Sequence, residues 1–352
     1  MPPLPAPEFR PAFRPRTPTP EQPVRVAVVG TGGWGEQHAR VFADRTDTEL
    51  VGVVGRDVTR ARARADAYRT DAYTDVDAML DTAQPDLVTV CLPNEEHFAP
   101  TLHLIERGVP LLVEKPLVFD LTEADALLDA AAERDLFVAI DLNHRYAEPV
   151  QRLKAAIDAG DLGALVFATW RFGGEPNLGG SRHANLIETQ VHGLDMLEQL
   201  CGPIASVMAQ PFDGTHPGTV TTLAVALEFA SGAVGTLLGT YDSSYAYPGT
   251  HLLEVNGTEG RGLVEDTVRR LTLSRAGDDV ARVWQAGYFD DEARDFHGTF
   301  DRYVDDLLRA LRAGGPPPVP AEAGRRALQV AHAIIRSGDE GVRVTVGTAS
   351  QA

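Results

Sequence analysis

Short apolar runs alternate with amphipathic stretches over the first part of the chain. Runs of strand length lie at residues 24–29, 50–54, 87–92, 111–113 and 137–140. Patterns of helical period lie between them, at residues 34–44, 59–68, 98–107 and 122–134. Continuously apolar strands separated by helices indicate a parallel sheet that is covered on both faces. The sequence therefore predicts an α/β domain here.

The pattern changes after about Pro149 to an alternation with a period of two. Leu223, Val225, Leu227 and Phe229 alternate with less apolar residues, and Ser231-Gly232 makes a tight turn into residues 233–241. Residues 164–172 are also strand-like, and Asn256-Gly257 predicts another turn. Helical patterns follow at residues 300–311 and 321–335, separated by prolines 316–318. Alternating strands joined by short turns indicate an α+β domain with a largely antiparallel sheet.

These patterns divide the chain into residues 1–23, 24–146 and 147–352. The first segment holds nine prolines, has no apolar core of signal-peptide length, and has no consecutive arginine pair among Arg10, Arg14 and Arg16. We therefore expect a mature, Pro-rich extended arm. It is either a disordered tail or an arm that packs against a second subunit.

Composition and charge narrow the class of protein. Of 352 residues, 43% are hydrophobic and 23% are charged, which is ordinary for globular domains. The net charge of −18 disfavours nucleic acid and anionic membrane surfaces as partners, and no apolar run approaches the ~18 residues of a membrane span. Two cysteines, Cys91 and Cys201, are too few for a disulfide framework. A cytoplasmic location is the expectation.

A glycine-rich turn follows the first predicted strand. Gly30-Thr31-Gly32-Gly33-Trp34-Gly35 matches GxGxxG and opens a helix, which is the context that dinucleotide binding requires. The first glycine permits the sharp turn, the second allows close approach of a pyrophosphate, and the third lets helix and strand pack. The helix N-terminus then offers N–H groups to the anion. The alternative is a bare tight turn.

The end of the second strand should decide between NAD and NADP. An acidic residue about 20 residues beyond the glycine turn would bind the ribose hydroxyls. Here the sequence is Gly55-Arg56-Asp57, so Arg56 stands where a guanidinium pairs with a 2′-phosphate. We expect NADP, with use of both cofactors left open because Asp57 is close. The alternative for Arg56 is a solvated loop arginine.

Polar residues follow three further strands of the first domain. In an open α/β sheet, ligands bind beyond the carboxyl ends of the strands. These positions are therefore expected to lie at the cofactor: Leu92, Pro93, Asn94, His97, Glu114 and Lys115, with Asn143 and Arg145 after the last strand.

Residues 186–201 read as one largely apolar helix with a single polar stripe. At 100° per residue the stripe contains Glu188, His192, Asp195 and Gln199. A buried polar stripe is either a satisfied core network or part of a site. No second histidine completes a zinc-binding helix, so no metal is expected.

Four motifs in this order resemble the glucose–fructose oxidoreductase/inositol dehydrogenase (Gfo/Idh/MocA) family. They are Gly30–Gly35, Glu114-Lys115-Pro116, Asn143-x-Arg145 and Glu188-xxx-His192-xx-Asp195. The resemblance covers about residues 24–344 and implies an N-terminal Rossmann domain and a C-terminal domain on an open sheet. It also implies homodimers or homotetramers packed through that sheet, and NAD(P)-dependent redox chemistry on sugars, cyclitols or related polyols.

The resemblance also implies roles for single residues. Lys115 matches the lysine that contacts nicotinamide and substrate, and His192 matches the acid/base histidine. Glu188 stands where the family often has aspartate, four residues before that histidine.

The chemistry then follows from these groups. His192 would take the hydroxyl proton of a secondary alcohol, since an imidazole titrates near neutral pH, and Lys115 would polarise the oxygen. Asn143 and Arg145 would hold neighbouring hydroxyls, and His183, Asp195 and Tyr241 are further candidates for substrate contact. Two alternatives stay open. One is a non-catalytic dinucleotide-binding sensor or co-repressor of the same fold, and the other is an enzyme that never releases its cofactor.

Overall fold

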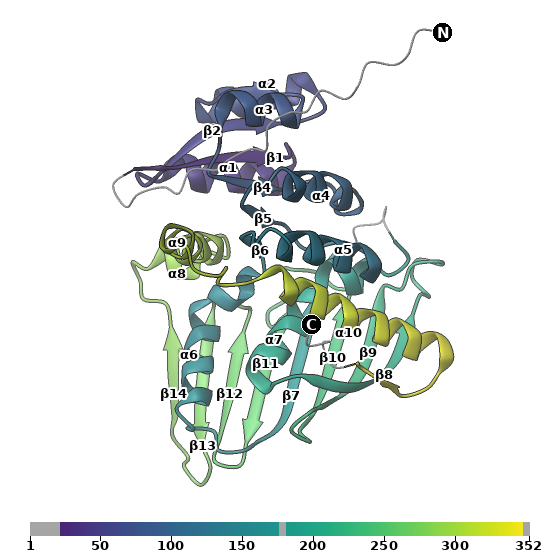
Figure 1. Ribbon diagram of the computed structural model, residues 1–352. Helices are drawn as coiled ribbons and strands as arrows, with labels where there is room; N and C mark the ends of the chain where they lie inside the picture. The colour runs from purple at the N-terminus through teal and green to yellow at the C-terminus, as the bar shows by residue number, and fades with distance from the viewer. Residues whose placement is uncertain (1–21, 176–180, 348–352) are drawn as a thin grey trace. The chain divides into compact units, whose positions relative to one another are not determined.

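The computed structural model describes residues 22–175 and 181–347, so the predicted arm at residues 1–23 lies almost wholly outside the described part. The chain forms two compact units (Figure 1). The first contains residues up to 114, 126–139 and 310–317, and the second contains residues 115–125, 140–309 and from 318 onward. Whereas the sequence pattern predicts one boundary near residue 146, the chain passes between the two compact units several times.

The first unit is built around a six-stranded sheet in the order β3-β2-β1-β4-β5-β6. Its strands are β1 (Val24–Val29), β2 (Thr48–Val54), β3 (Ala72–Tyr73), β4 (Leu87–Val90), β5 (Leu111–Val113) and β6 (Val138–Ile140). The pairings of β1 with β2 and β4, of β2 with β3 and of β4 with β5 are parallel. Its order is that of a doubly wound dinucleotide-binding sheet, which confirms the predicted Rossmann class.

The helices between these strands begin and end close to the predicted limits. They are α1 (Gly33–Asp44), α2 (Val58–Tyr68), α3 (Val76–Ala83), α4 (Phe98–Glu106) and α5 (Leu121–Ala132), with a 3₁₀ turn, η1, at Asn94–Glu96. The prediction omitted β3 and α3, because a two-residue strand and an eight-residue helix carry too little periodicity to stand out. Strands β1 and β4 are buried almost completely. Their side chains form the core that holds the carboxyl ends of the strands in place.

The second unit contains a nine-stranded sheet in the order β14-β13-β12-β11-β7-β10-β9-β8-β15. Its strands are β7 (Leu165–Gly173), β8 (Ile204–Phe212), β9 (Thr222–Phe229), β10 (Val234–Thr240), β11 (His251–Gly257), β12 (Gly260–Glu265), β13 (Arg270–Arg275), β14 (Ala281–Gln285) and β15 (Val344–Thr345). The β7–β10 pairing is parallel and the others are antiparallel. The predicted largely antiparallel sheet is therefore confirmed.

Helices cover one face of this sheet (Figure 1). They include α6 (Glu148–Asp158), which packs on β12 and β13, α7 (Val191–Cys201), which packs on β7, and α10 (Ala321–Glu340), which packs on β8. The remaining elements are the turns η2 (Asn143–Tyr146) and η3 (Asn185–Thr189) and the helices α8 (Asp291–Arg294) and α9 (Gly298–Ala313). Alternate residues of β9 and β10 are buried, so the opposite face stays open. No helix among the described residues is long and apolar enough to span a bilayer.

The structure corrects the prediction of one helix over residues 186–201. Asn185–Thr189 form a π turn, and a regular α-helix begins only at Val191. A π turn has more residues per turn than an α-helix, so Glu188 leaves the straight polar stripe that 100° per residue predicts. The glycine at 257 ends β11, and the turn into β12 is Thr258-Glu259 rather than Asn256-Gly257.

Candidate active site

The glycine turn has the geometry that anion binding requires. Gly30 has a φ of +133°, and a Cβ on it would lie 2.1 Å from the carbonyl oxygen of Cys91. A Cβ on Gly35 would lie 2.3 Å from the carbonyl oxygen of Gly30. A Cβ on Gly32 or Gly33, in contrast, would meet no described atom within 4 Å. Gly30 and Gly35 are thus needed for packing, whereas Gly32 and Gly33 leave open space beside the backbone.

The N-terminus of α1 has no side-chain cap within the described structure. Its N-cap residue, Gly32, has no side chain to satisfy the first N–H groups, which are therefore suited to an anionic ligand. Thr31 and Trp34 complete the turn, and Trp34 is 37% exposed. The open backbone and the uncapped helix together fit a bound pyrophosphate.

The end of β2 places Arg56 and Asp57 in different roles. Asp57 Oδ1 accepts hydrogen bonds from the amides of Thr59 and Arg60, at 2.9 and 3.0 Å, and so caps α2. The hydrogen bond from the Arg60 amide is the main reason that the Asp57 pKa is lowered. Arg56 stays 76% exposed and pairs with Glu96 at 3.0 Å. The carboxylate is therefore committed to the helix, and the guanidinium remains at the surface.

The ends of β4 and β5 carry the other residues predicted for the cofactor. After β4, Leu92, Pro93 and Asn94 lead into η1, and the buried His97 ring bonds through Nε2 to the Leu92 carbonyl at 3.0 Å. At the end of β5, Glu114 is buried and its Oε1 lies 3.1 Å from His38 Nε2 on α1. His97 and Glu114 thus support the backbone of these strand ends.

Lys115 and His192 lie in the same compact unit. Lys115 Nζ donates a 2.9 Å hydrogen bond to the backbone carbonyl of Glu188 on η3. The charge of Lys115 contributes to lowering the pKa of His192. The ammonium group and the imidazole therefore act on each other electrostatically, although 77 positions separate them in the sequence.

His192 is 7% exposed and lies in the first turn of α7. Its pKa is held well below the usual value, first by burial and then by the charges of His144, Lys115 and His251. Its Nδ1 has no hydrogen-bond partner within residues 22–175 and 181–347. The ring is therefore neutral at pH 7, which is the form that accepts a proton.

Two predicted substrate contacts, Arg145 and Asp195, bind each other. Arg145 Nε donates to Asp195 Oδ2 at 2.8 Å, and its Nη2 donates to Oδ1 of the same carboxylate. Burial raises the pKa of Asp195, and the Arg145 guanidinium opposes that rise. Asn143, 2% exposed on the same turn, has a side-chain nitrogen without a partner in the described structure. An unpaired buried donor is costly unless a ligand satisfies it, which favours Asn143 as a substrate contact.

Tyr241 and His183 lie in different surroundings. The hydroxyl of Tyr241, directly after β10, bonds to Thr189 Oγ1 at 2.7 Å, and burial raises its pKa to about 12. The charge of Glu188 also acts on Tyr241, so this phenol belongs to the region around η3. His183 instead lines a small cavity with Asp339 of α10.

A buried polar network fixes the junction between η3 and α7. Gln190 accepts a 3.0 Å hydrogen bond from Trp170 Nε1 and donates one of 3.0 Å to Asn185 Oδ1. A Cβ on Gly193 would lie 2.3 Å from Trp170 Nε1, so glycine is needed where α7 crosses β7. His192 therefore stands between two positions whose packing is tightly constrained.

Sequence reasoning missed two buried histidines of this region. His144 stacks on His192 with ring centroids 4.1 Å apart, and His251 packs edge-on against His144 at 5.8 Å. His144 lies inside the Asn143–Arg145 motif and could have been included on that ground. His251, whose Nδ1 bonds to Thr267 Oγ1 at 2.7 Å, has no local motif that points to it.

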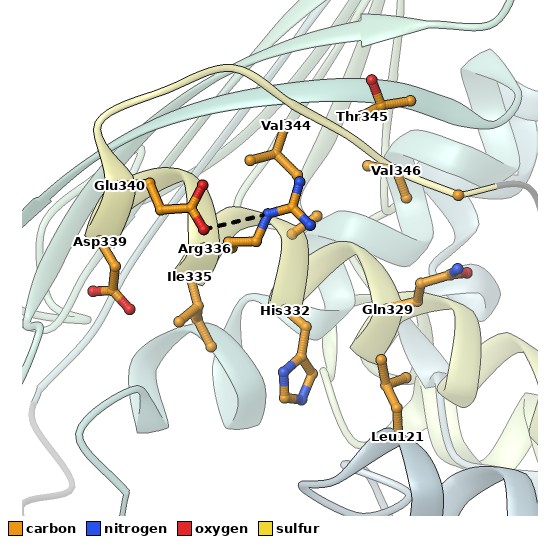
Figure 2. A pocket seen from close by; sticks show the side chains of 12 residues that line it. Leu121, Gln329, His332, Ile335, Arg336, Asp339, Glu340, Val344, Thr345 and Val346 are labelled. Carbon is orange, nitrogen blue, oxygen red and sulfur yellow. Dashed lines mark ion pairs between the residues drawn. The ribbon is translucent and has the colours of Figure 1, made fainter.

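An open cavity of about 480 Å³ lies beside the C-terminal half of α10 (Figure 2). Its polar wall includes the ion pair of Arg336 with Glu340, at 3.8 Å, and His332, which bonds to the Phe119 carbonyl. No residue that the sequence predicts for catalysis or cofactor binding lines this cavity. It is therefore separate from the candidate active site.

Two family models cover most of the chain. The model described as "Oxidoreductase family, NAD-binding Rossmann fold" matches residues 24–142, and "Oxidoreductase family, C-terminal alpha/beta domain" matches residues 154–346. The chain belongs to this family, the Gfo/Idh/MocA oxidoreductases, as the four motifs predicted.

Relatives with known activities are dehydrogenases. Myo-inositol 2-dehydrogenase of Thermotoga maritima is 25% identical over 334 residues, which are 90% of this chain and 97% of that protein. D-glucoside 3-dehydrogenase of Escherichia coli K12 is 34% identical over 151 residues, only 42% of this chain and 43% of that protein. Levoglucosan dehydrogenase, solved with NADH and levoglucosan, has a TM-score of 0.85 at 19% identity and covers 93% of this chain and 100% of its own. That likeness shows the fold.

The two kinds of glycine in the turn predict two kinds of defect. Gly30→Ala should lower the free energy of unfolding by about 2 kcal/mol or more, because it combines a positive φ with a backbone clash. Gly32→Ala should leave stability nearly unchanged but weaken NAD(P) binding by about tenfold, which corresponds to ~1.4 kcal/mol. Chemical unfolding and calorimetric titration with NAD(P) measure the two effects. Equal NAD(P) affinity in Gly32→Ala and wild type would contradict the proposed approach of the pyrophosphate.

Proposed function

We propose that the protein transfers a hydride between NAD(P) and a secondary alcohol or ketone of a sugar, cyclitol or related polyol. Membership of the oxidoreductase family and the dehydrogenase names of its relatives support this reaction class. The observation that carries the proposal is the presence in one unit of the Lys115 ammonium and a neutral, buried His192. A non-catalytic sensor would need neither group.

We assign the proton chemistry to these two side chains. His192 accepts the hydroxyl proton during oxidation and returns it during reduction, while Lys115 stabilises the negative charge that develops on the oxygen. Lys115 is held for this role by the Glu188 carbonyl, so Glu188 contributes through its backbone. The unpaired amide of Asn143 would bind a neighbouring hydroxyl, and Tyr241 would border the same region. Bound NAD(P) would supply the hydride acceptor or donor.

Arg145 and Asp195 have a different place in this scheme. Both oxygens of Asp195 already accept from Arg145, so a substrate hydroxyl would only add a second hydrogen bond to an oxygen that is already paired. The pair instead joins η2 to α7 and so supports Asn143 and His192. His183, beside Asp339, remains a weaker candidate for substrate contact.

We further propose that NADP is the preferred cofactor. Asp57 is committed to capping α2, whereas the exposed Arg56 can pair with a 2′-phosphate. Glu96 competes with that phosphate for the guanidinium, since it binds Arg56 at 3.0 Å. Binding of NADP would therefore replace one anionic partner of Arg56 by another.

We also propose a cytoplasmic homodimer or homotetramer formed through the open face of the nine-stranded sheet. Exposed apolar residues of that face lie on β8 and β10: Met208, Phe212, Val234 and Leu238. An apolar patch of this kind on a sheet favours contact with another apolar surface.

Removal of the Lys115 charge should strongly lower turnover. Lys115→Met keeps the aliphatic chain, and we expect kcat to fall by about 100-fold or more because charge stabilisation at the oxygen is lost. NADP affinity should stay measurable. The assay follows cofactor reduction with myo-inositol, D-glucose, D-xylose and levoglucosan. Lys154, the only other lysine, gives the matched control Lys154→Met, which should behave as wild type. Wild-type kcat in Lys115→Met would refute the assignment.

Substitutions at the Arg56–Glu96 pair should move cofactor preference in opposite directions. Arg56→Gln should lower the ratio of NADP to NAD affinity by about tenfold through loss of a charge-assisted hydrogen bond. Glu96→Gln should raise that ratio, because it removes the competing carboxylate. Titration of each variant with both cofactors measures the ratio. If neither substitution changes it, Arg56 only faces solvent.

Charge on the open sheet face should disrupt the oligomer. Val234 and Leu238 lie on the same face of β10 and are 55% and 39% exposed. The double substitution Val234→Glu/Leu238→Glu should give a monomer in light scattering, because carboxylates buried in an interface are costly. Val58→Glu, at the exposed start of α2 in the first unit, is the control. A wild-type protein that is itself a monomer would disprove the oligomer.

A further inference from the structure

The two rings of His144 and His192 form a parallel stack in the second unit. Their centroids lie 4.1 Å apart and their planes differ by 21°. His144 is 2% exposed and His192 is 7% exposed. One face of the candidate base is therefore covered by a second imidazole rather than by solvent.

Aromatic side chains hold the His144 ring in this position. Phe296 and Phe172 pack edge-on against it, with centroid distances of 5.3 and 6.1 Å, and Trp170 lies at 6.0 Å. His251 also packs edge-on at 5.8 Å. These contacts come from β7, β11 and the segment before α9, so the ring has little freedom to rotate.

The next residue makes a second connection to α7. Arg145 forms the two-pronged ion pair with Asp195, three residues after His192 and hence on the same side of the helix. His144 and Arg145 are neighbours on η2, so this turn contacts α7 through two successive side chains. Aromatic packing thus holds the His144 ring, and the Arg145–Asp195 ion pair holds η2 against the helix that carries His192.

We propose that His144 is a positioning residue that stacks on His192, sets the orientation of its ring and keeps it uncharged. The inference rests on the proposed role of His192 as the base. Two imidazolium rings at this distance would repel each other in a buried site, so a proton on one disfavours a proton on the other. As the pH falls, the stack therefore disfavours protonation of both rings together.

Other charged groups around the stack also affect the protonation of His192. Lys115 and His251 face both rings and also disfavour protonation. Glu188 lies on η3, and Asp195 is paired with Arg145.

The remaining charged side chains near the stack either form an ion pair with each other or act on His251. On the α10 side of α7, Glu198 is paired with Arg326 at 2.8 Å. Asp266 and Arg171 act on His251 with opposite signs. Burial is the largest cause of the lowered pKa of His144 and of His192, and His144 is the next cause for His192.

Two substitutions separate orientation from charge. His144→Phe keeps an aromatic ring against His192 and removes the titrating group, so the midpoint of His192 protonation should move to higher pH while the ring stays in place. His144→Leu removes the stacking ring as well, so kcat should fall by about 10- to 100-fold even at a pH where His192 is neutral. Conservative replacement by Phe should restore most of that kcat.

The primary measurement needs no substrate. NMR of histidine-labelled protein, with His192→Gln to assign the His192 signal, follows its protonation from about pH 9 down to the onset of acid unfolding. His103→Gln, a half-exposed histidine of the first unit, is the control and should leave the His192 midpoint unchanged. Thermal unfolding and NADP titration establish that each variant is folded.

The outcomes distinguish this inference from the proposed reaction. A His192 midpoint that rises in His144→Phe supports the inference, even if the wild type reduces NAD(P) with none of the four polyols. The same midpoint in His144→Phe and wild type overturns it, even if the enzyme is active. Equal kcat in His144→Leu and wild type, with an unchanged His192 signal, overturns the orienting role.

Discussion

The free-energy cost of burying a charge determines the protonation state of the buried histidines in the second unit. His144, His192 and His251 are withdrawn from water beside Trp170 and Phe172, and their pKa values are lowered chiefly by that burial. A buried imidazolium without a partner loses its hydration and gains nothing in return. The neutral imidazole that a proton acceptor requires is thus a product of packing. In the proposed mechanism, proton transfer and core formation depend on the same contacts.

Packing this close demands that the surrounding backbone be fixed by its own hydrogen bonds. The π turn at Asn185–Thr189 ends at Gln190, whose amide side chain binds both Trp170 and Asn185. The turn directs the Glu188 carbonyl to Lys115 and shifts the Glu188 side chain off the stripe of a regular helix. Glu188 is one methylene longer than the aspartate that the family often has at this position. Its backbone also differs from that of an uninterrupted helix, because it lies in the π turn.

Local features of the fold were predictable from the sequence, and long-range ones were not. The strand, Gly30–Gly35 and the following helix are contiguous, so spacing alone identifies the turn. The single helix over residues 186–201 was a wrong prediction, because a π turn leaves the apolar pattern almost unchanged. The Arg145–Asp195 pair joins residues 50 positions apart, and β7 pairs in parallel with β10 across several other elements. No local pattern encodes such partners.

The chain passes from one compact unit to the other at the peptide bond between Glu114 and Lys115. On one side of this bond, the Glu114 carboxylate is held by His38 within the first unit. On the other side, Lys115 is held by the Glu188 carbonyl within the second. The ammonium group thus lies in the same compact unit as His192, and the hydrogen bond that holds it is internal to that unit. The proton chemistry proposed for Lys115 and His192 therefore rests on contacts within the second unit.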